Sequence, residues 1–322
     1  MKAIRIEQYG GPETLQYQEI PLPEPQTGEV RVRLEAVGVN YIDIYHRTGI
    51  YPVGLPFTVG SEAAGVVEAL GPEVTEVKIG DRVGYAMSLG AYAEAAIVPA
   101  WKCIPLPASF GALHAAAVLL QGMTVHYLAY GSYMIRPGDT VLVHAAAGGV
   151  GLLLVQIARH LGAFVIGTVS TPAKVEIVKE AGAQEVILYM ETDFLQEVKR
   201  ITEGRGVHAV YDSVGQTTFD RGLDCLRHRG TLVLFGQSSG PVAPFNPSIL
   251  AAKGSLFLTR PTLAHYAATR EELLARATTV LDWVTSGTLK IRIDKTFPLS
   301  EAAEAQRRLE SRVSTGKILL IP

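Results

Sequence analysis

A regular alternation of apolar strands and amphipathic helices fills the middle of the chain and constrains its fold more than any other feature. Strands are expected at 140–146, 163–170, 185–189, 208–214, 231–236 and 254–259, and helices at 149–162, 171–182, 192–204 and 217–230. Thr171 is the expected cap of the second helix, with Pro172 at its first position. Strands that are apolar on both faces and are joined by helices form a parallel sheet covered on both sides. The sequence therefore predicts an α/β fold with a doubly wound parallel sheet.

The two ends of the chain have a different pattern. The first 110 residues contain short alternating or β-branched runs punctuated by Gly and Pro, which predicts a β-rich domain. After the sheet, helical patterns at 269–288 and 295–312 precede a final strand at 316–321. We expect this tail to return to the first domain. The predicted division is therefore 1–122, completed by 263–322, and an inserted domain at 123–262.

Composition excludes several classes of protein. The chain has 322 residues, of which 48% are hydrophobic and 19% charged, with a net charge of −2, so no bulk attraction to nucleic acid or membranes is expected. Two cysteines, Cys103 and Cys225, make no disulfide framework, and reduced thiols indicate a cytoplasmic protein. No secretory signal and no uncharged apolar run of membrane-spanning length is recognised.

The loop "HAAAGGVG" joins the first strand of the parallel sheet to its helix. Against the dinucleotide pattern Gly-x-Gly-x-x-Gly it places Ala146, Gly148 and Gly151 at the three glycine positions. A helix N-terminus here offers backbone N–H groups to a pyrophosphate, so Gly148, Gly149 and Val150 are candidate cofactor contacts. A tight turn without ligand is the alternative, and the strand–helix context disfavours it.

The end of the second strand distinguishes between nicotinamide cofactors. Enzymes that use NAD usually have an acidic residue there, about 20 residues after the first glycine. This chain has Ser170 instead, with Lys174 four residues later. A hydroxyl and a cation suit a 2′-phosphate, which predicts NADPH, although Lys174 is also compatible with an ordinary solvated helix residue. The other strand ends line the same edge of the sheet. They nominate Tyr189, Ser213, Phe235, Gly236, Gln237 and Ser238 as further cofactor contacts, with ordinary loop residues as the alternative.

The order of the segments and several motifs resemble a known family. The motifs are "GGPETL", "GVNYIDIYHRTGIYP", "GSEAAGVV", "GDRV", "HAAAGGVG", "YDSVG", "LDCL", "RGTLVLFG", "GSLFLTRPTL" and "ESRVSTGKILLIP". Over its whole length the chain resembles the medium-chain dehydrogenase/reductase superfamily, and within it the zinc-independent quinone oxidoreductase (zeta-crystallin-like) branch. The resemblance implies a GroES-like catalytic domain at 1–122 and 263–322, and a Rossmann NADP-binding domain at 123–262.

The motif "GSEAAG" bears on whether the protein binds a catalytic zinc ion. Zinc-dependent members of the superfamily have a histidine where this chain has Ser61 and a cysteine where it has Asn40. Hydroxyl and carboxamide groups are poor zinc ligands, and the cysteines of a structural zinc loop are missing, so no metal is expected. Glu62 is then interpreted as a support residue that pairs with a nearby cation, and its role is left open.

The segment 40–51 holds the candidate catalytic residues, because in relatives it faces the nicotinamide and the substrate. Asn40 is a candidate to bind either the nicotinamide ribose or a substrate carbonyl. Tyr45 and Tyr51 are candidates to stack on a ring or donate a hydrogen bond, with Tyr45 also a cofactor contact. Packing is the alternative for both tyrosines, and Asp43 suits a base or a turn-fixing role equally. Thr124 and Tyr127, at the opening of a linking helix, and Arg260 complete the expected cofactor contacts.

The resemblance implies an NADPH-dependent reductase of small quinones. Alternatives are an NADPH-dependent alkenal or enone reductase, and a cofactor-binding structural or RNA-binding protein with little catalysis. The near-neutral charge argues against RNA as the main partner. The apolar edge strand 254–259 needs cover, and in the family it pairs with its twin, which implies a homodimer.

Overall fold

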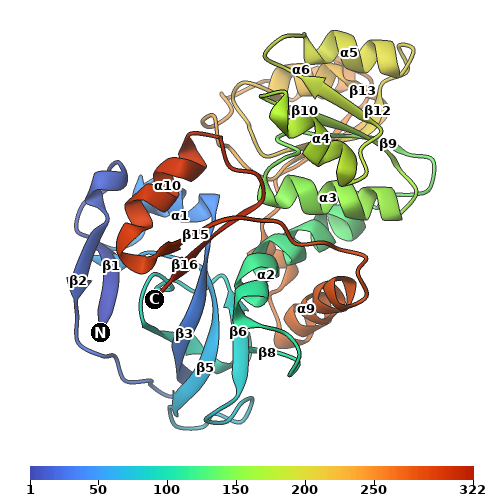
Figure 1. Cartoon of the computed structure of the whole chain (residues 1–322). Helices are drawn as coiled ribbons and strands as arrows, with labels where there is room; N and C mark the ends of the chain where they lie inside the picture. The colour runs from blue at the N-terminus through green and yellow to red at the C-terminus, as the bar shows by residue number, and fades with distance from the viewer. The chain divides into compact units, whose positions relative to one another are not determined.

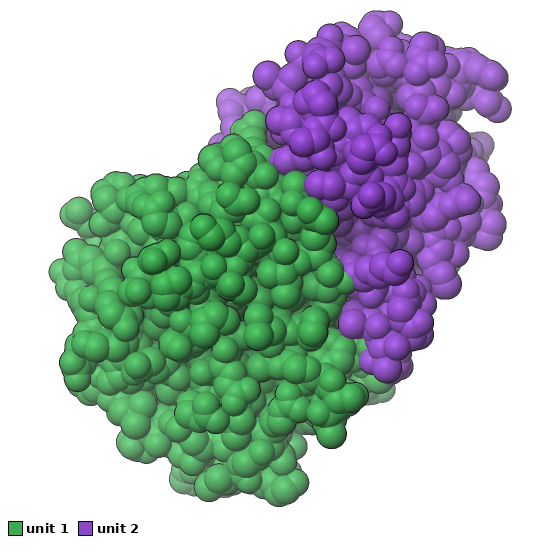
Figure 2. Space-filling model, viewed as in Figure 1, with its two compact units in different colours: residues 1–123, 267–281, 291–322 green, residues 124–266, 282–290 purple.

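The chain folds into two compact units, seen in a computed structural model that describes all 322 residues. Unit 1 comprises 1–123, 267–281 and 291–322, and unit 2 comprises 124–266 and 282–290 (Figure 2). Unit 1 is thus built from both ends of the chain and unit 2 mainly from its middle. The stretches 263–266 and 282–290, expected in the tail, belong to unit 2.

Unit 2 contains a six-stranded parallel sheet (Figure 1). Its strands are β9 (Thr140–Val143), β10 (Phe164–Val169), β11 (Glu185–Leu188), β12 (Val207–Asp212), β13 (Leu226–Leu234) and β14 (Phe257–Thr259). Its helices are α3 (Gly149–His160), α4 (Ala173–Glu180), α5 (Phe194–Ile201), α6 (Phe219–Asp224), α7 (Ser248–Ala252) and α8 (Leu263–Tyr266). The strand order β11-β10-β9-β12-β13-β14 reverses direction between β9 and β12, which is the dinucleotide-binding order. The prediction of a doubly wound Rossmann sheet is confirmed.

Two local predictions in unit 2 are wrong. The helix expected at 217–230 ends at Asp224, and β13 begins at Leu226, which pairs with Val207. Leu226 is buried in the core of the sheet, so this apolar side chain is used by a strand and not by the helix. The second helix begins at Ala173, after Pro172, without the side-chain cap that was expected from Thr171.

Unit 1 contains two sheets, one of three strands and one of seven, as the β-rich pattern predicted. One has the order β2-β1-β4, and the other β15-β16-β3-β5-β6-β8 with β7 paired to β3. The strands are β1 (Lys2–Ile6), β2 (Gln16–Glu19), β3 (Glu29–Val39), β4 (Phe57–Thr58), β5 (Glu62–Leu70), β6 (Arg82–Ala86), β7 (Ala95–Pro99), β8 (Ile104–Pro105), β15 (Ile293–Pro298) and β16 (Lys317–Ile321). The C-terminal β16 lies antiparallel beside β3 (Figure 1). The tail therefore completes the N-terminal sheet, and this pairing brings distant polar residues together.

Four further helices complete the fold: α1 (Tyr41–Arg47), α2 (Ala112–Tyr127), α9 (Arg270–Thr285) and α10 (Ala302–Glu310). A single π-helical turn, Leu128–Ser132, continues α2. The stretch Ala112–Ser132 is the one helix long and apolar enough to cross a membrane, and most of it is buried inside the fold. Such burial is typical of the core helix of a globular protein, for which apolar side chains are equally required.

Candidate functional site

The glycine turn after β9 has the geometry that a pyrophosphate needs. Gly148 is the N-cap of α3, and no side chain caps this helix end. The first N–H groups of a helix have no partner within it, and together with the helix dipole they bind anions. A Cβ on Gly151 would lie 2.4 Å from the carbonyl oxygen of Ala145, so only glycine lets α3 approach β9 this closely. The residues present therefore fit the phosphates of a dinucleotide.

The remaining residues nominated from strand ends lie at one edge of the sheet. All six strands are parallel, so the segments that follow them share the carboxyl edge. Ser170 follows β10, and Lys174 is buried in the first turn of α4. Tyr189 follows β11, Ser213 follows β12, Phe235 to Ser238 follow β13, and Arg260 follows β14. No acidic residue stands at the end of β10, so no carboxylate at this strand end would repel a phosphate.

Asp212 organises this edge, although it was not predicted from the sequence. Its side chain is fully buried at the end of β12 and accepts hydrogen bonds from the N–H groups of Val214 and Gly215 at 2.7 and 3.1 Å, and from the Thr218 hydroxyl at 2.8 Å. The loop after β13 is bound to the loop after β12, because the Ser238 N–H donates to the Ser213 carbonyl. The sequence does contain a signal for this role, because Asp212 is an acidic residue at the end of an apolar strand and is followed by Ser-Val-Gly.

Thr124 and Tyr127 lie in the last turn of α2, not at its start as expected. The Tyr127 ring stacks on Tyr266 with centroids 4.5 Å apart, and burial raises the pKa of its hydroxyl above the usual range. Both residues are buried. The helix begins at Ala112 because the apolar helical pattern extends without interruption from that residue. Thr124 therefore lies near its end and does not mark its start.

In unit 1, Asn40 belongs to a buried polar triad with Glu62 and Lys317. The Lys317 ammonium lies 2.6 Å from Glu62 Oε2 and 2.8 Å from Asn40 Oδ1. Asn40 Nδ2 donates to the same Glu62 oxygen at 2.8 Å, and Glu62 Oε1 accepts from the Leu120 N–H at 2.7 Å. The Lys317 and Glu62 side chains are 1% and 0% exposed. Glu62 thus pairs with a cation, and the cation is Lys317 at the start of β16.

Asp43 is the centre of a second buried network, connected to the first through Asn40. Its carboxylate accepts from the Asn40 N–H at 2.9 Å, from Ser61 Oγ at 2.8 Å and from the Tyr92 hydroxyl at 3.1 Å. It therefore holds three separate segments of unit 1 together. Burial raises the pKa of Asp43 to about 6, although these hydrogen bonds and the charge of Lys317 act in the opposite direction.

The raised pKa of Asp43 predicts that unit 1 becomes less stable as the pH rises from about 4 to about 6. In this window the unfolded chain has lost the Asp43 proton and the folded chain retains it, so each pH unit lowers the free energy of unfolding by about 1.4 kcal/mol. Asp43→Asn should abolish this dependence, because an amide can accept from Asn40 and Tyr92 and donate to Ser61. Urea unfolding of both proteins across this pH range tests the expectation, and parallel curves would contradict it.

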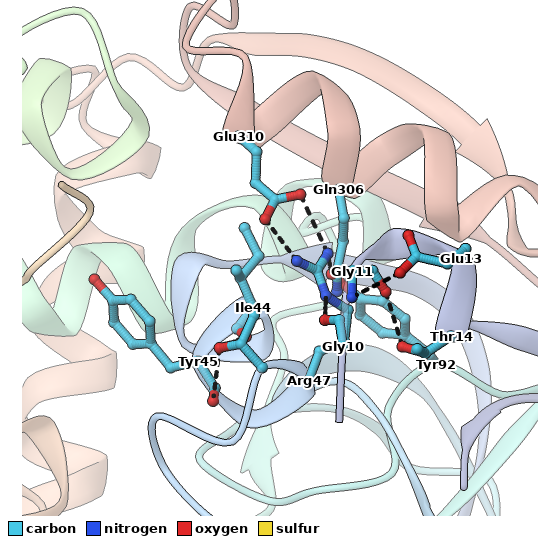
Figure 3. A network of polar contacts seen from close by, with 11 residues as sticks. Gly10, Gly11, Glu13, Thr14, Ile44, Tyr45, Arg47, Tyr92, Gln306 and Glu310 are labelled. Atoms are coloured by element: carbon cyan, nitrogen blue, oxygen red, sulfur yellow. Dashed lines mark hydrogen bonds and ion pairs between the residues drawn. The ribbon is translucent and has the colours of Figure 1, made fainter. Parts of the chain in front are cut away.

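The tyrosines of this segment pack against one another. The Tyr45 ring lies 5.1 Å from that of Tyr51, edge to face, and 5.5 Å from that of Tyr41. Tyr45 is 6% exposed and Tyr51 is half-buried. Tyr45 points away from Arg47, which lies on the opposite side of α1 (Figure 3). The two tyrosines nominated for substrate contact are thus brought together, with Tyr51 the more accessible.

The positions that correspond to zinc ligands serve these hydrogen-bond networks. Ser61 donates to Asp43, and Asn40 bonds to Glu62 and Lys317. No group of three or more His, Cys, Asp or Glu side chains that could hold a metal ion occurs in the structure. Lys317 was not identified from the sequence, where it is a single lysine within an apolar strand.

Comparisons with known proteins support the same architecture. A family model described as "Alcohol dehydrogenase GroES-like domain" matches residues 26–108, and one described as "Zinc-binding dehydrogenase" matches 149–278. A quinone oxidoreductase of Pseudomonas aeruginosa is 47% identical over 100% of this chain and 99% of its own length. A 2-haloacrylate reductase of Burkholderia is 43% identical over 99% and 98%.

A solved structure extends the likeness to three dimensions. The quinone oxidoreductase of Escherichia coli, complexed with NADPH, is 45% identical and superimposes with a TM-score of 0.98 over 100% of both chains. The GroES-like and Rossmann domains expected from the sequence are thus present. Full-length identity at this level leads to one assignment: the chain belongs to the quinone oxidoreductase branch of the medium-chain dehydrogenase/reductase superfamily.

Proposed function

We propose that this protein is an NADPH-dependent, zinc-independent reductase of small quinones. The uncapped N-terminus of α3, at the reversal of strand order, is the observation that carries the proposal. A helix N-terminus at this point of the sheet suits a dinucleotide pyrophosphate. Relatives named quinone oxidoreductases, one of them complexed with NADPH, support the acceptor and the cofactor.

The bound nicotinamide would supply the hydride, and the protein would bind and orient the reactants. Gly148, Gly149 and Val150 would hold the pyrophosphate, and Ser170 and Lys174 the 2′-phosphate. A quinone accepts electrons into a conjugated ring, so it needs a placed nicotinamide and a flat apolar site more than a Lewis acid. Tyr45 and Tyr51 are the proposed surface for that ring, and Asn40 and Ser61 carry side chains that suit hydrogen bonding and not zinc.

Lys174→Ala should lower kcat/KM for NADPH by ten- to a hundredfold and leave that for NADH almost unchanged. The expected loss is about 1.5–3 kcal/mol, the contribution of a hydrogen bond to a charged group. Lys179→Ala is the matched control, because Lys179 is exposed on the same helix and pairs with Glu176. Steady-state kinetics with both cofactors measure the effect. An equal loss for NADH would contradict the assignment of Lys174 to the 2′-phosphate.

Oxidation of NADPH, followed by its absorbance, tests the function directly. The expected result is turnover with 1,4-benzoquinone or 9,10-phenanthrenequinone. Turnover of alkenals or haloacrylates alone would instead support reduction of conjugated C=C bonds, which the relative named 2-haloacrylate reductase favours. NADPH binding without turnover of any acceptor would favour a structural role and refute the enzyme.

We also propose a homodimer formed through β14, in a cytoplasmic protein. β14 is an edge strand of the six-stranded sheet, and Phe257 on it is 61% exposed. An apolar edge of this kind is a template for pairing with a second copy. The two cysteine thiols are free and buried, in keeping with a reducing compartment.

Phe257→Glu should convert the dimer to a monomer, because it places a charge at the edge where two sheets would join. Light scattering after size-exclusion chromatography measures the mass. Met190→Glu is the control, since Met190 is 71% exposed in the loop after β11, the opposite edge strand. A dimer that survives Phe257→Glu would show that β14 is not the interface.

A further inference from the structure

The hydrogen-bonding capacity of the Asn40 amide is almost wholly used inside unit 1. Both hydrogens of Nδ2 have acceptors, Glu62 Oε2 at 2.8 Å and the Gly38 carbonyl at 3.2 Å. Oδ1 accepts from Lys317 at 2.8 Å, and its second contact, Gln121 Nε2 at 3.5 Å, is at the limit of hydrogen-bond distance. An amide has two donors and two acceptor lone pairs. The one site that a ligand can take with little loss is therefore the second lone pair of Oδ1.

The ion pair of Glu62 and Lys317 decides this orientation. A flipped amide would direct N–H groups at the Lys317 ammonium, which has no acceptor, and its oxygen at the Glu62 carboxylate, which has no donor. Both contacts would be repulsive, and both side chains are almost fully buried. The carboxylate is held in its turn by the Leu120 N–H. Gly38 also packs closely against the Glu62 carboxylate. A Cβ on Gly38 would lie 2.3 Å from Glu62 Oε2, so the position accepts only glycine.

We propose that Glu62 and Lys317 are positioning residues that present Asn40 solely as a hydrogen-bond acceptor, and that Asn40 serves a donor on the nicotinamide half of NADPH. This rests on the proposed function. The ribose hydroxyls and the carboxamide N–H of that half are donors. An oxidised quinone has only carbonyl acceptors, which Asn40 in this orientation cannot bind. Of the two ligands considered for Asn40 from the sequence, the geometry thus selects the cofactor.

Calorimetric titration with NADPH and with adenosine 2′,5′-bisphosphate tests the proposal without relying on turnover. Asn40→Ala should weaken NADPH binding about tenfold and leave the bisphosphate unchanged, because the bisphosphate lacks the nicotinamide half. Lys317→Met alone would strand a buried carboxylate and threaten folding. The informative variant is therefore Glu62→Gln with Lys317→Met, which removes both charges and releases the amide. It should weaken NADPH binding similarly, and adding Asn40→Ala to it should cause no further loss.

The matched control is Lys102→Met, which removes a half-buried lysine of unit 1 that bonds to the Met87 carbonyl, outside the triad. Its NADPH affinity should stay within twofold. Additive losses in the triple variant would show that the ion pair acts independently of Asn40 and would overturn the proposal. An Asn40→Ala protein with unchanged NADPH affinity and a raised KM for quinone would overturn it as well. Wild-type protein that binds neither ligand would refute the proposed function itself, an outcome distinct from both.

Discussion

Replacing Arg47 by Met is expected to lower the free energy of unfolding by about 2–4 kcal/mol, because a buried guanidinium is lost and its partners lose their donor. The Arg47 side chain is 1% exposed and donates to the Gly10 carbonyl at 3.1 Å and to Gln306 Oε1 at 2.6 Å (Figure 3). It also forms two bonds to Glu310. A methionine fills part of the volume but leaves the half-buried Gly10 carbonyl and the buried Gln306 amide oxygen without this donor, and an unsatisfied buried group costs about 1–3 kcal/mol.

The matched control for Arg47 is Arg307→Met on α10. Arg307 is exposed and paired with Glu304 one turn away, so its removal should change stability by less than about 1 kcal/mol. Arg47→Lys should recover only part of the loss, because an ammonium does not match the carboxylate with a planar fork. Urea denaturation of the four proteins measures the differences. Equal stability of Arg47→Met and Arg307→Met would show that the guanidinium is not needed to join α1 to α10.

Adding a single methyl group at Gly151 is expected to damage both the fold of unit 2 and its affinity for NADPH. The new Cβ would lie 2.4 Å from the Ala145 oxygen and 2.8 Å from Ala146 Cα, and these backbone atoms belong to the turn itself. The start of α3 must therefore move away from β9. Overpacking of this kind costs about 1–3 kcal/mol, and displacing the helix N-terminus should weaken NADPH binding at least tenfold.

Gly148→Ala, at the same turn, separates the effect on stability from the effect on NADPH binding. Its Cβ would meet only the Ala145 oxygen, at 3.2 Å, and its backbone angles are open to any residue. This variant should keep the melting temperature within a few degrees and yet weaken NADPH binding, because the methyl group stands where the pyrophosphate approaches. Thermal unfolding and calorimetry report on the two properties. A Gly151→Ala protein as stable as Gly148→Ala would show that the close approach of α3 to β9 is dispensable.

Local patterns in the sequence predicted most of unit 2, because its elements are determined by neighbours along the chain. The apolar strands, the helices between them and the glycine turn lie close to where they were expected. The helix expected at 217–230 is an exception, because Leu226 is equally suited by its apolar side chain to a helix and to a strand. Its pairing with Val207 decides between the two, and such pairing has no signature within a short window.

The polar interior of unit 1 shows the opposite case. From the sequence, the resemblance to zinc-dependent relatives implied that Asn40 and Ser61 stand at metal-ligand positions, and Glu62 was interpreted as pairing with a cation. Only the tertiary structure determined that the cation is Lys317, which is 255 residues from Glu62 and 277 from Asn40. Arg47 and Glu310, 263 residues apart, are a second example. A buried charge requires a partner because its transfer from water is costly. The identity of that partner depends on the pairing of β16 with β3, two strands that are separated in the sequence by the whole of unit 2.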